Sequence, residues 1–290
     1  MTSRAGSPPI SRPVSTIVIR LNDDDDATPD SAAACDDGVA TITLDRPDTL
    51  NSLTDDLMDD LSHALASAQA DPRARVIVIT GSGRGFCSGA DLGGVRQPVE
   101  GAASGDHSAV DGMDRHFNPA LRAIKEAAIP TVARVNGVAA GGGLGLALAC
   151  DITIAARSAF FVATFGPRLG IVPDLGTTWT LPARVGLARA MGMAMLGERI
   201  SADRAAEWGL IYTAVDDDQL DAAVTRVTDI LKRTSGEAMS RIRSSIDSAS
   251  TRSFCEQLDL ERDHQAVLIP MNMHEGAAAF LEKREPNFSR

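Results

Sequence analysis

The sequence predicts an α/β protein whose C-terminal part is helical. Segments typical of strands recur through the first half of the chain, at 38–47, 74–81 and 131–135. Segments with the periodicity of amphipathic helices separate them. From Pro173 onward the strand pattern fades and helical patterns follow one another. This order indicates an α/β core followed by a helical region.

The N-terminal part shows three features before the core. Residues 1–13 are rich in Ser, Pro and Arg and lack the apolar centre of a signal peptide, so we expect a disordered tail. Residues 14–21 alternate like a strand. Residues 22–37 contain four consecutive aspartates without the spacing or closing Glu of a calcium loop. We therefore expect a solvated acidic insertion between two strands.

The remaining elements follow in order. A helix is expected after Thr54, an N-cap residue, with Leu57, Leu61 and Leu65 on one face. The apolar run 74–81 is typical of a strand buried on both faces. The elements expected further along are a helix at 115–128, strands at 131–135, 151–156 and 159–163, and helices at 187–196, 201–208, 217–233, 235–248 and 255–269. We place the core at 14–199 and the helical C-terminal region at 200–290.

Composition excludes several functional classes. The 290 residues carry a formal net charge of −11, and 4% are aromatic, so no nucleic-acid partner is expected. No apolar run is long enough to span a bilayer, and no membrane association is expected. The four cysteines are scattered without a CxxC pair, a pattern typical of free thiols in the cytoplasm. No metal site is predicted.

A glycine-rich turn, "NGVAAGGGLGLALACD" at 136–151, is the first candidate site. Three glycines stand between an apolar strand and an Ala/Leu-rich helix. The first N–H groups of a helix have no partner within it, and glycine leaves them open to an anionic group. Leu146 breaks a dinucleotide-binding fingerprint here, and no Gly-Lys-Ser/Thr tripeptide occurs in the chain. Tight helix packing is the alternative explanation for the glycines.

A second glycine loop, "GSGRGFCSGADL" at 81–92, follows the preceding strand. If the two strands are parallel neighbours, both loops lie at one sheet edge, and their backbone N–H groups converge. Paired backbone donors can stabilise a thioester oxygen as it becomes an enolate.

Six ordered motifs carry a family resemblance. They are "GVATITLDRPDTLNSL", "GRGFCSGADL", "NGVAAGGG", "CDITIAARSAFF", "PDLGTTWTLP" and "EGAAAFLEKREPNF". Together they resemble the crotonase (enoyl-CoA hydratase/isomerase) superfamily over nearly everything after residue 38. The resemblance implies a spiral of ββα units with a helical C-terminal trimerisation region, assembled as a homotrimer or homohexamer. It also implies an acyl-CoA substrate and no separate cofactor, since coenzyme A is part of the substrate.

The resemblance also assigns catalytic positions. It places the backbone N–H groups of Ala90 and Gly142 in an oxyanion hole. The two glutamates of the hydratases fall at Gly145 and Phe165, which cannot transfer protons, so ordinary hydratase activity is not expected. Asp174 then resembles the lone acid/base residue of several isomerases. From the residues alone, the favoured role of Asp174 is the N-cap of the next helix, and the resemblance reverses this preference.

The resemblance further implies which residues line the path of the CoA thioester. They are Arg46, Ser52, Ser88, Gly89, Asp91, Leu92, Gly141, Phe165, Pro173, Phe280 and Lys283. Phe280 and Lys283 match residues that meet the adenine end, often from a neighbouring subunit. Lys283 is otherwise a plain surface lysine, and Cys87 is expected to be a packed thiol.

Within the superfamily, "GRGFCSGADL", "FNP", "AARSAFFV", "PDLGTTWTLP" and "QLDLERDHQ" resemble ring-1,2-epoxyphenylacetyl-CoA isomerases of phenylacetate degradation. The histidine and tryptophan of the related dehalogenases are replaced by Asn118 and Phe165. We therefore predict an acyl-CoA isomerase that transfers a proton through an enolate. A 2-enoyl-CoA hydratase and a non-catalytic acyl-CoA-binding scaffold are the alternatives, and the acyl group stays open.

Overall fold

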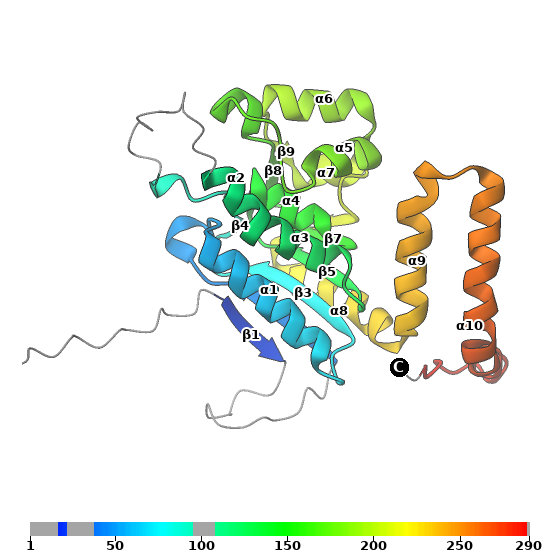
Figure 1. Ribbon diagram of the computed structural model, residues 1–290. Helices are drawn as coiled ribbons and strands as arrows, with labels where there is room; N and C mark the ends of the chain where they lie inside the picture. The colour runs from blue at the N-terminus through cyan, green and yellow to red at the C-terminus, as the bar shows by residue number, and fades with distance from the viewer. Residues whose placement is uncertain (1–16, 22–37, 95–107, 289–290) are drawn as a thin grey trace, which may run out of the picture.

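The computed structural model describes residues 17–21, 38–94 and 108–288 (Figure 1). The expected N-terminal tail at 1–13 and the acidic insertion at 22–37 lie outside the described residues. Within the described part, the chain forms two β-sheets surrounded by helices, with a pair of helices projecting to one side (Figure 1).

The larger sheet has six strands in the order β1-β2-β3-β5-β7-β10. They are β1 (Ile17–Leu21), β2 (Val39–Leu44), β3 (Val76–Gly81), β5 (Thr131–Val135), β7 (Ile152–Ala156) and β10 (Thr213–Val215). The β1–β2 pair is antiparallel and the other pairs are parallel. Every residue of β3 is buried, as its continuous apolar sequence predicts.

The smaller sheet has four strands in the order β4-β6-β8-β9. They are β4 (Gly85–Cys87), β6 (Val138–Ala140), β8 (Phe160–Val162) and β9 (Ile200–Ser201). The strands β4, β6 and β8 each follow a strand of the larger sheet, namely β3, β5 and β7. The chain therefore alternates between the sheets as it advances, which is the expected spiral.

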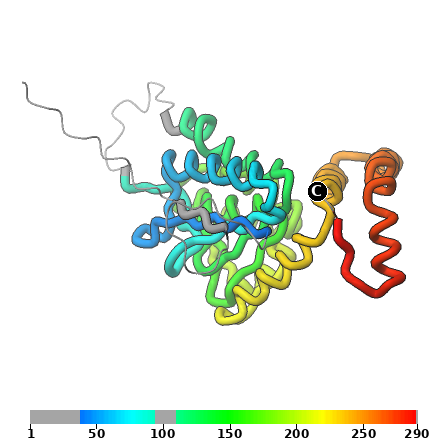
Figure 2. The backbone as a smooth tube through the Cα atoms, turned by 90° about the horizontal axis from the view of Figure 1, so that it is seen from below, coloured from blue at the N-terminus to red at the C-terminus, as the bar shows by residue number. Residues whose placement is uncertain are grey.

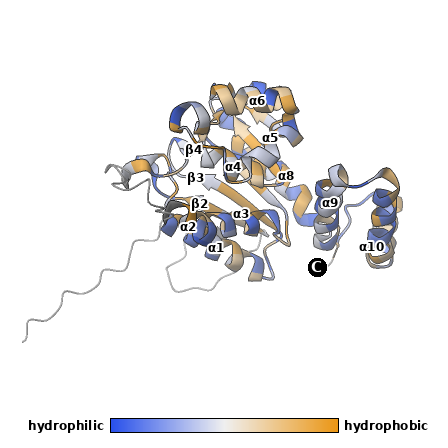
Figure 3. Cartoon of the chain, turned by 45° about the horizontal axis from the view of Figure 1, so that its top comes forward, coloured by the Kyte–Doolittle hydropathy of each residue, from blue (hydrophilic) through white to orange (hydrophobic). Residues whose placement is uncertain are grey.

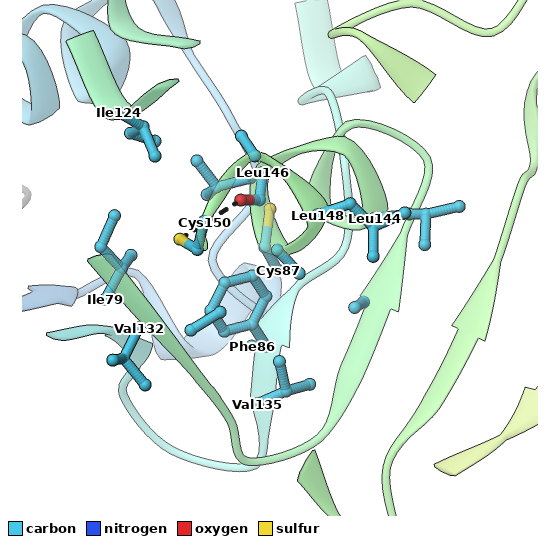
Figure 4. Close-up of a cluster of buried hydrophobic side chains, with 14 of the residues drawn as sticks. Ile79, Phe86, Cys87, Ile124, Val132, Val135, Leu144, Leu146, Leu148 and Cys150 are labelled. Carbon is cyan, nitrogen blue, oxygen red and sulfur yellow. Dashed lines mark hydrogen bonds between the residues drawn. The ribbon is translucent and has the colours of Figure 1, made fainter. Parts of the chain in front are cut away.

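Helix α4 (Gly142–Ala149) is buried at all eight of its residues and contacts strands of both sheets. Figure 4 shows its leucines meeting Ile79, Phe86 and Val135 in one apolar cluster. The surrounding helices are α1 (Asp55–Ala70), α2 (Ser108–Gly112) and α3 (Asn118–Lys125), with the π-helical turn η3 (Met113–Phe117) between the last two. Thr54 caps α1 by accepting from the Leu57 N–H, as predicted.

The C-terminal part is mostly helical. Its helices are α5 (Thr177–Val185), α6 (Leu187–Leu196), α7 (Ala202–Glu207), α8 (Leu220–Arg233), α9 (Gly236–Ser248) and α10 (Phe254–Glu282). One expectation was wrong: β9 and β10 follow Pro173, and β10 extends the larger sheet. Strands of two or three residues are too short to show a periodic pattern. The boundary at residues 199 and 200 stays a prediction.

The helix expected at 255–269 is also longer than predicted. Helix α10 begins at a capping box of Ser253 and Glu256, continues through Pro270 and ends where Lys283 adopts a left-handed φ of 55°. Figures 1 and 2 show α9 and α10 side by side, with α10 on the far side of α9 from the sheets. Arg243 on α9 holds this pair to the core through Asp151, with an Nε–Oδ1 distance of 2.6 Å.

Helix α10 buries one residue, Ala279, although it carries many apolar side chains (Figure 3). Those that stand exposed are Phe254, Leu258, Val267, Ile269, Met271, Met273, Phe280 and Leu281. None of the described helices is both long and apolar enough to cross a membrane.

Candidate active site

The two glycine-rich loops lie against each other. They contain β4 and β6, which pair in parallel, so that the glycines after each strand come close together. A Cβ atom added to Gly89 would lie 3.3 Å from the backbone nitrogen of Gly142 and 2.8 Å from the carbonyl oxygen of Ala140. Gly89 and Gly141 also adopt positive φ angles of 94° and 51°. Glycine is therefore required at 89 both by the backbone conformation and by the close approach of the loops.

The backbone of Ala90 is held by its neighbours and leaves its own N–H unused. Leu53 donates to the carbonyl of Gly89 at 2.8 Å, and Asp91 donates to the carbonyl of Leu53 at 2.8 Å. In such a parallel bridge between Leu53 and Ala90, the N–H of Ala90 points away from Leu53. No acceptor for it exists among the hydrogen bonds of the described residues.

The N–H of Gly142 is the second unused donor. The carbonyl of Gly141 accepts from the N–H groups of Leu144 and Gly145, at 3.0 Å and 3.3 Å. Gly142, the first residue of α4, has no acceptor among the described hydrogen bonds. A backbone donor at the start of a buried helix, together with a second donor on the adjacent loop, can stabilise an oxygen that gains negative charge. The structure thus places the loops that carry Ala90 and Gly142 against each other, and their role as an oxyanion hole stays a prediction.

Asp174 has a partly buried carboxylate, and its side chain does not cap a helix. Its Oδ1 atom is buried and accepts no hydrogen bond from the described residues. Burial raises the pKa of Asp174, and a hydrogen bond to its own backbone lowers it by a smaller amount. The N-cap of α5 is Gly176, and no side chain caps this helix. The N-cap interpretation of Asp174 is therefore wrong.

Leu175 connects Asp174 to the glycine turn. Its Cδ1 atom lies 2.6 Å from where a Cβ of Gly142 would be, and its carbonyl oxygen lies 2.7 Å from where a Cβ of Gly145 would be. Leu175 is buried and has a positive φ of 50°, which is uncommon for a residue with a side chain. The glycines at 142 and 145 make room for the turn that carries Asp174.

Thr177 is a polar residue of this site that the sequence did not reveal. It is fully buried, and its hydroxyl has no hydrogen-bond partner among the described residues. The hydroxyl oxygen lies 3.1 Å from where a Cβ of Gly145 would be. A buried unpartnered hydroxyl costs free energy, as the Asp174 oxygen does. In the sequence, Thr177 is one of two threonines at a helix start, and no signal separates it from the other.

Phe165 and Pro173 lie close to the same turn. Phe165 is buried and begins the π-helical turn η4 (Phe165–Leu169), with its Cζ atom 4.0 Å from where a Cβ of Gly141 would be. Pro173 is partly buried and precedes Asp174. An aromatic ring therefore occupies the position that the resemblance gives to an acidic residue.

A cavity of about 700 Å³ adjoins the two loops. Its lining includes Ser88 and Ala140, the residues that directly precede Gly89 and Gly141. Leu92, which was predicted to line the CoA path, is also part of the wall. The volume is that of an ordinary small-molecule site.

The comparison with known families agrees with this geometry. Residues 34–290 match the family model described as enoyl-CoA hydratase/isomerase. The chain belongs to this family.

Members of the enoyl-CoA hydratase/isomerase family with different names are equally similar to the chain. The 1,2-epoxyphenylacetyl-CoA isomerase of Escherichia coli (strain K12) is 42% identical over 87% of this chain and 95% of its own length. A "probable enoyl-CoA hydratase" of Rhodobacter capsulatus is 42% identical over the same shares. An enoyl-CoA hydratase from Polaromonas sp. JS666 matches the fold with a TM-score of 0.80 at 32% identity, covering 87% of this chain and 96% of that one. The chain has the crotonase fold, as predicted.

Three of the residues predicted to line the CoA path form a network in this family member. Arg46 donates to Asp91 Oδ2 at 2.8 Å and to Ser52 Oγ at 3.0 Å, and Ser52 donates to Asp91 at 3.1 Å. The hydrogen bond from Arg46 lowers the pKa of Asp91. These contacts hold the loop that carries Ala90, so their side chains are engaged within the protein.

Two other predicted residues are not brought to the site within one chain. Phe280 is 83% exposed on α10, and Lys283 forms the end of that helix. Helix α10 lies on the far side of α9 from the two loops (Figures 1 and 2). A role for either residue in this family member would have to involve a neighbouring subunit.

Cys87 and Cys150 are buried thiols whose pKa values are raised. Burial raises the pKa of Cys87 and of Cys150 to about 12. A thiol at such a pKa has almost no thiolate at neutral pH. Among the described residues, no cluster of His, Cys, Asp and Glu could hold a metal ion.

Proposed function

We propose that this member of the family is an acyl-CoA isomerase with Asp174 as its acid/base residue. The N–H groups of Ala90 and Gly142 would donate to the thioester oxygen while the thioester loses a proton and becomes an enolate. Asp174 would take a proton from one carbon and return it to another. The observation that carries the proposal is the buried, unpartnered carboxylate oxygen of Asp174, one residue before the leucine that packs on Gly142.

The environment of Asp174 suits this chemistry. A carboxylate with an ordinary pKa is a weak base, and burial raises the pKa of Asp174 toward values useful for proton transfer. The same carboxyl group can serve as base and then as acid, because the enolate persists in the oxyanion hole between the two steps. No second proton-transfer group is needed for such a shift.

Hydratase activity is the second candidate, supported by the hydratase name of the relative from Rhodobacter capsulatus. Adding water requires a group to orient and deprotonate it. At Gly145 the carbonyl oxygen of Leu175 fills the space that a side chain would need, and Phe165 offers no proton. These two positions favour isomerisation.

A non-catalytic scaffold is the third candidate. It predicts that Asp174 has a structural role, such as capping α5. Gly176 occupies the cap position, and the carboxylate oxygen is unpartnered. An unpartnered buried oxygen costs stability, and a scaffold would gain nothing from keeping it.

The test is a panel of acyl-CoA substrates followed for double-bond migration, hydration and ring-epoxide opening. The panel includes crotonyl-CoA and 2-enoyl and 3-enoyl thioesters, together with 1,2-epoxyphenylacetyl-CoA, the substrate named for the relative from Escherichia coli. We expect isomerisation, together with solvent deuterium incorporation at the α or γ carbon in D₂O. Efficient hydration of crotonyl-CoA without migration would replace the proposal with the hydratase. Binding without any turnover or exchange would favour the scaffold.

We also propose that the protein assembles as a homotrimer or homohexamer. The apolar side chains exposed along α10 support a partner of the same chain, because so many are unusual on a monomer's surface. Light scattering should give three or six times the chain mass. A monomer at micromolar concentration would contradict this proposal.

A further inference from the structure

Asp174 and Thr177 are the two ends of one tight turn. The backbone N–H of Thr177 donates to the carbonyl of Asp174 at 2.9 Å. The two residues between them, Leu175 and Gly176, have positive φ angles of 50° and 74°. This is the arrangement of a β-turn, in which the first and last Cα atoms lie within about 7 Å of each other. The turn therefore holds the backbone of Thr177 close to that of Asp174.

The side chains at the two ends of the turn have complementary needs. Oδ1 of Asp174 and Oγ1 of Thr177 are both buried, and neither has a hydrogen-bond partner among the described residues. A carboxylate oxygen accepts hydrogen bonds, and a threonine hydroxyl can donate one. Each atom is costly to bury alone. A bond between them would remove both costs.

Helix α5 gives the Thr177 hydroxyl no carbonyl to which it can donate. Threonine hydroxyls within a helix often donate to the carbonyl four residues earlier, as Thr180 does to Gly176 at 3.1 Å. Thr177 is the first residue of α5, so no helical carbonyl precedes it. Its hydroxyl oxygen lies 3.1 Å from where a Cβ of Gly145 would be, so the glycine leaves it room. The hydroxyl is thus available to a partner outside the helix.

The carboxylate of Asp174 needs a group that orients it. None of the described residues forms an ion pair with it, and burial is the main cause of its raised pKa. The terminal torsion of an aspartate is broad, so its oxygens have no preferred direction of their own. A general base must keep one oxygen within hydrogen-bond reach of the proton that it takes. A donor that fixes the first oxygen also fixes the second.

We propose that Thr177 is a positioning residue for Asp174. Its hydroxyl donates to Oδ1 of the ionised carboxylate and leaves Oδ2 to take the proton of the substrate. That proton passes from carbon to Oδ2 and back to another carbon, while the hydroxyl proton of Thr177 stays on Oγ1. This inference rests on the proposed function, because it takes Asp174 to be the base. Thr177 acts through Asp174 and does not touch the substrate.

The experiment replaces Thr177 by valine, which has nearly the same shape without the hydroxyl. A hydrogen bond to the ionised form lowers the pKa of a carboxyl group, so its loss should raise the pKa of Asp174 further. Thr177→Val should therefore move the acidic limb of the kcat/KM pH profile up by about one pH unit. It should also lower kcat above this limb by about tenfold and leave KM unchanged. Thr177→Ser keeps the hydroxyl and should restore the limb and most of kcat.

Thr180→Val is the matched control. Thr180 is also a buried threonine of α5, but its hydroxyl donates to the carbonyls of Gly176 and Thr177. This variant should have a lower Tm and keep the kcat and the pH profile of the wild type. Thr177→Ala takes the place of Thr177→Val if the valine variant does not fold, with the same expected shift.

A double-mutant cycle shows whether Thr177 acts through Asp174. In Asp174→Asn the base is absent, so adding Thr177→Val should cause no further fall in the residual kcat. An equal fall in both backgrounds would overturn the positioning role.

The remaining outcomes separate this inference from the proposed function. A wild-type pH profile for Thr177→Val, or a serine variant as impaired as the valine variant, would overturn the positioning role while the isomerase proposal stands. The same shift in Thr180→Val would assign the effect to packing of α5 and would overturn it as well. Normal turnover by Asp174→Asn would refute the proposed function itself.

Discussion

Replacing Asp174 by asparagine should change stability and activity in opposite directions. Asparagine keeps the size of the side chain but cannot accept a proton at neutral pH. We expect the variant to be more stable than the wild type and to lose at least ~100-fold in kcat, the lower end for general acid–base groups. A residue that only caps a helix gives the reverse result, with lower stability and normal turnover.

The size of the stability gain follows from the surroundings of the carboxylate. A buried polar group without a partner costs about 1–3 kcal/mol. Asp174 is only partly buried, so solvent screening reduces the gain from neutralising it to about 1 kcal/mol. For a chain of this size, such a gain corresponds to a rise in Tm of roughly 2–4 °C.

The gain should depend on pH with a defined sign. Burial raises the pKa of Asp174 above its ordinary value of 3.8, so the folded protein holds this proton more tightly than the unfolded chain. At pH values well below 3.8, the carboxyl group is protonated in both the folded and the unfolded protein, so the wild type has no charge penalty. As pH rises from 3.8 through the raised pKa, the wild type loses stability relative to the variant. Above the raised pKa the difference is constant.

The assay is urea unfolding of both proteins across this pH range, with kcat measured on the best substrate of the panel. Asp151→Asn is the control, because Asp151 is a carboxylate whose oxygens are used by Arg243 and Thr131. That variant should lose at least ~1 kcal/mol and keep its kcat. If Asp174→Asn is less stable than the wild type at pH 7 and turns over normally, Asp174 is structural and the proposed mechanism fails.

Two other substitutions test the glycine turn. Gly142→Pro removes one oxyanion donor and also sets a Cβ 2.6 Å from Leu175 Cδ1. Loss of the donor by itself should cost ~2.7–4 kcal/mol of barrier, so we expect at least a 10²–10³-fold fall in kcat with acyl-CoA binding retained; unchanged kcat in the folded variant would place the oxyanion hole elsewhere. Gly145→Ala would set a Cβ 2.7 Å from the Leu175 carbonyl oxygen and should displace the turn that carries Asp174. It should therefore lower kcat and Tm together, and a variant equal to wild type in both would show that this turn does not position Asp174.

Much of the fold could be predicted because its core elements are strongly patterned. The continuous apolar run of β3 and the capped, amphipathic α1 appear in the structure with boundaries close to those expected. The two glycine loops could also be located, because glycine is needed where backbones approach closely and φ is positive. Their meeting at Gly89 and Gly142 depends on β4 and β6 being parallel neighbours. Each of those strands has three residues, which is too few for a sequence pattern.

The site residues that the sequence missed depend on contacts between distant segments. Thr177 is noteworthy because its hydroxyl is buried and unpartnered, a property of the folded state. Conversely, the cap interpretation of Asp174 failed because Gly176 adopts the left-handed conformation and takes the cap position. Local propensity favoured Asp174 as the N-cap of α5. In the folded protein Leu175 packs on the glycine turn, and Gly176 is the N-cap.

In the proposed reaction, the side chains that are absent from the site matter as much as those that are present. A side chain at 145 and the turn at 174–175 compete for one space, because the Leu175 carbonyl lies 2.7 Å from where a Cβ of Gly145 would be. A chain that keeps the turn in this position cannot also hold a glutamate at 145 without moving Asp174. Restoring a glutamate at 145 should therefore not add hydration to isomerisation. It should instead displace Asp174, because a side chain at 145 and the Leu175 carbonyl oxygen cannot occupy the same space.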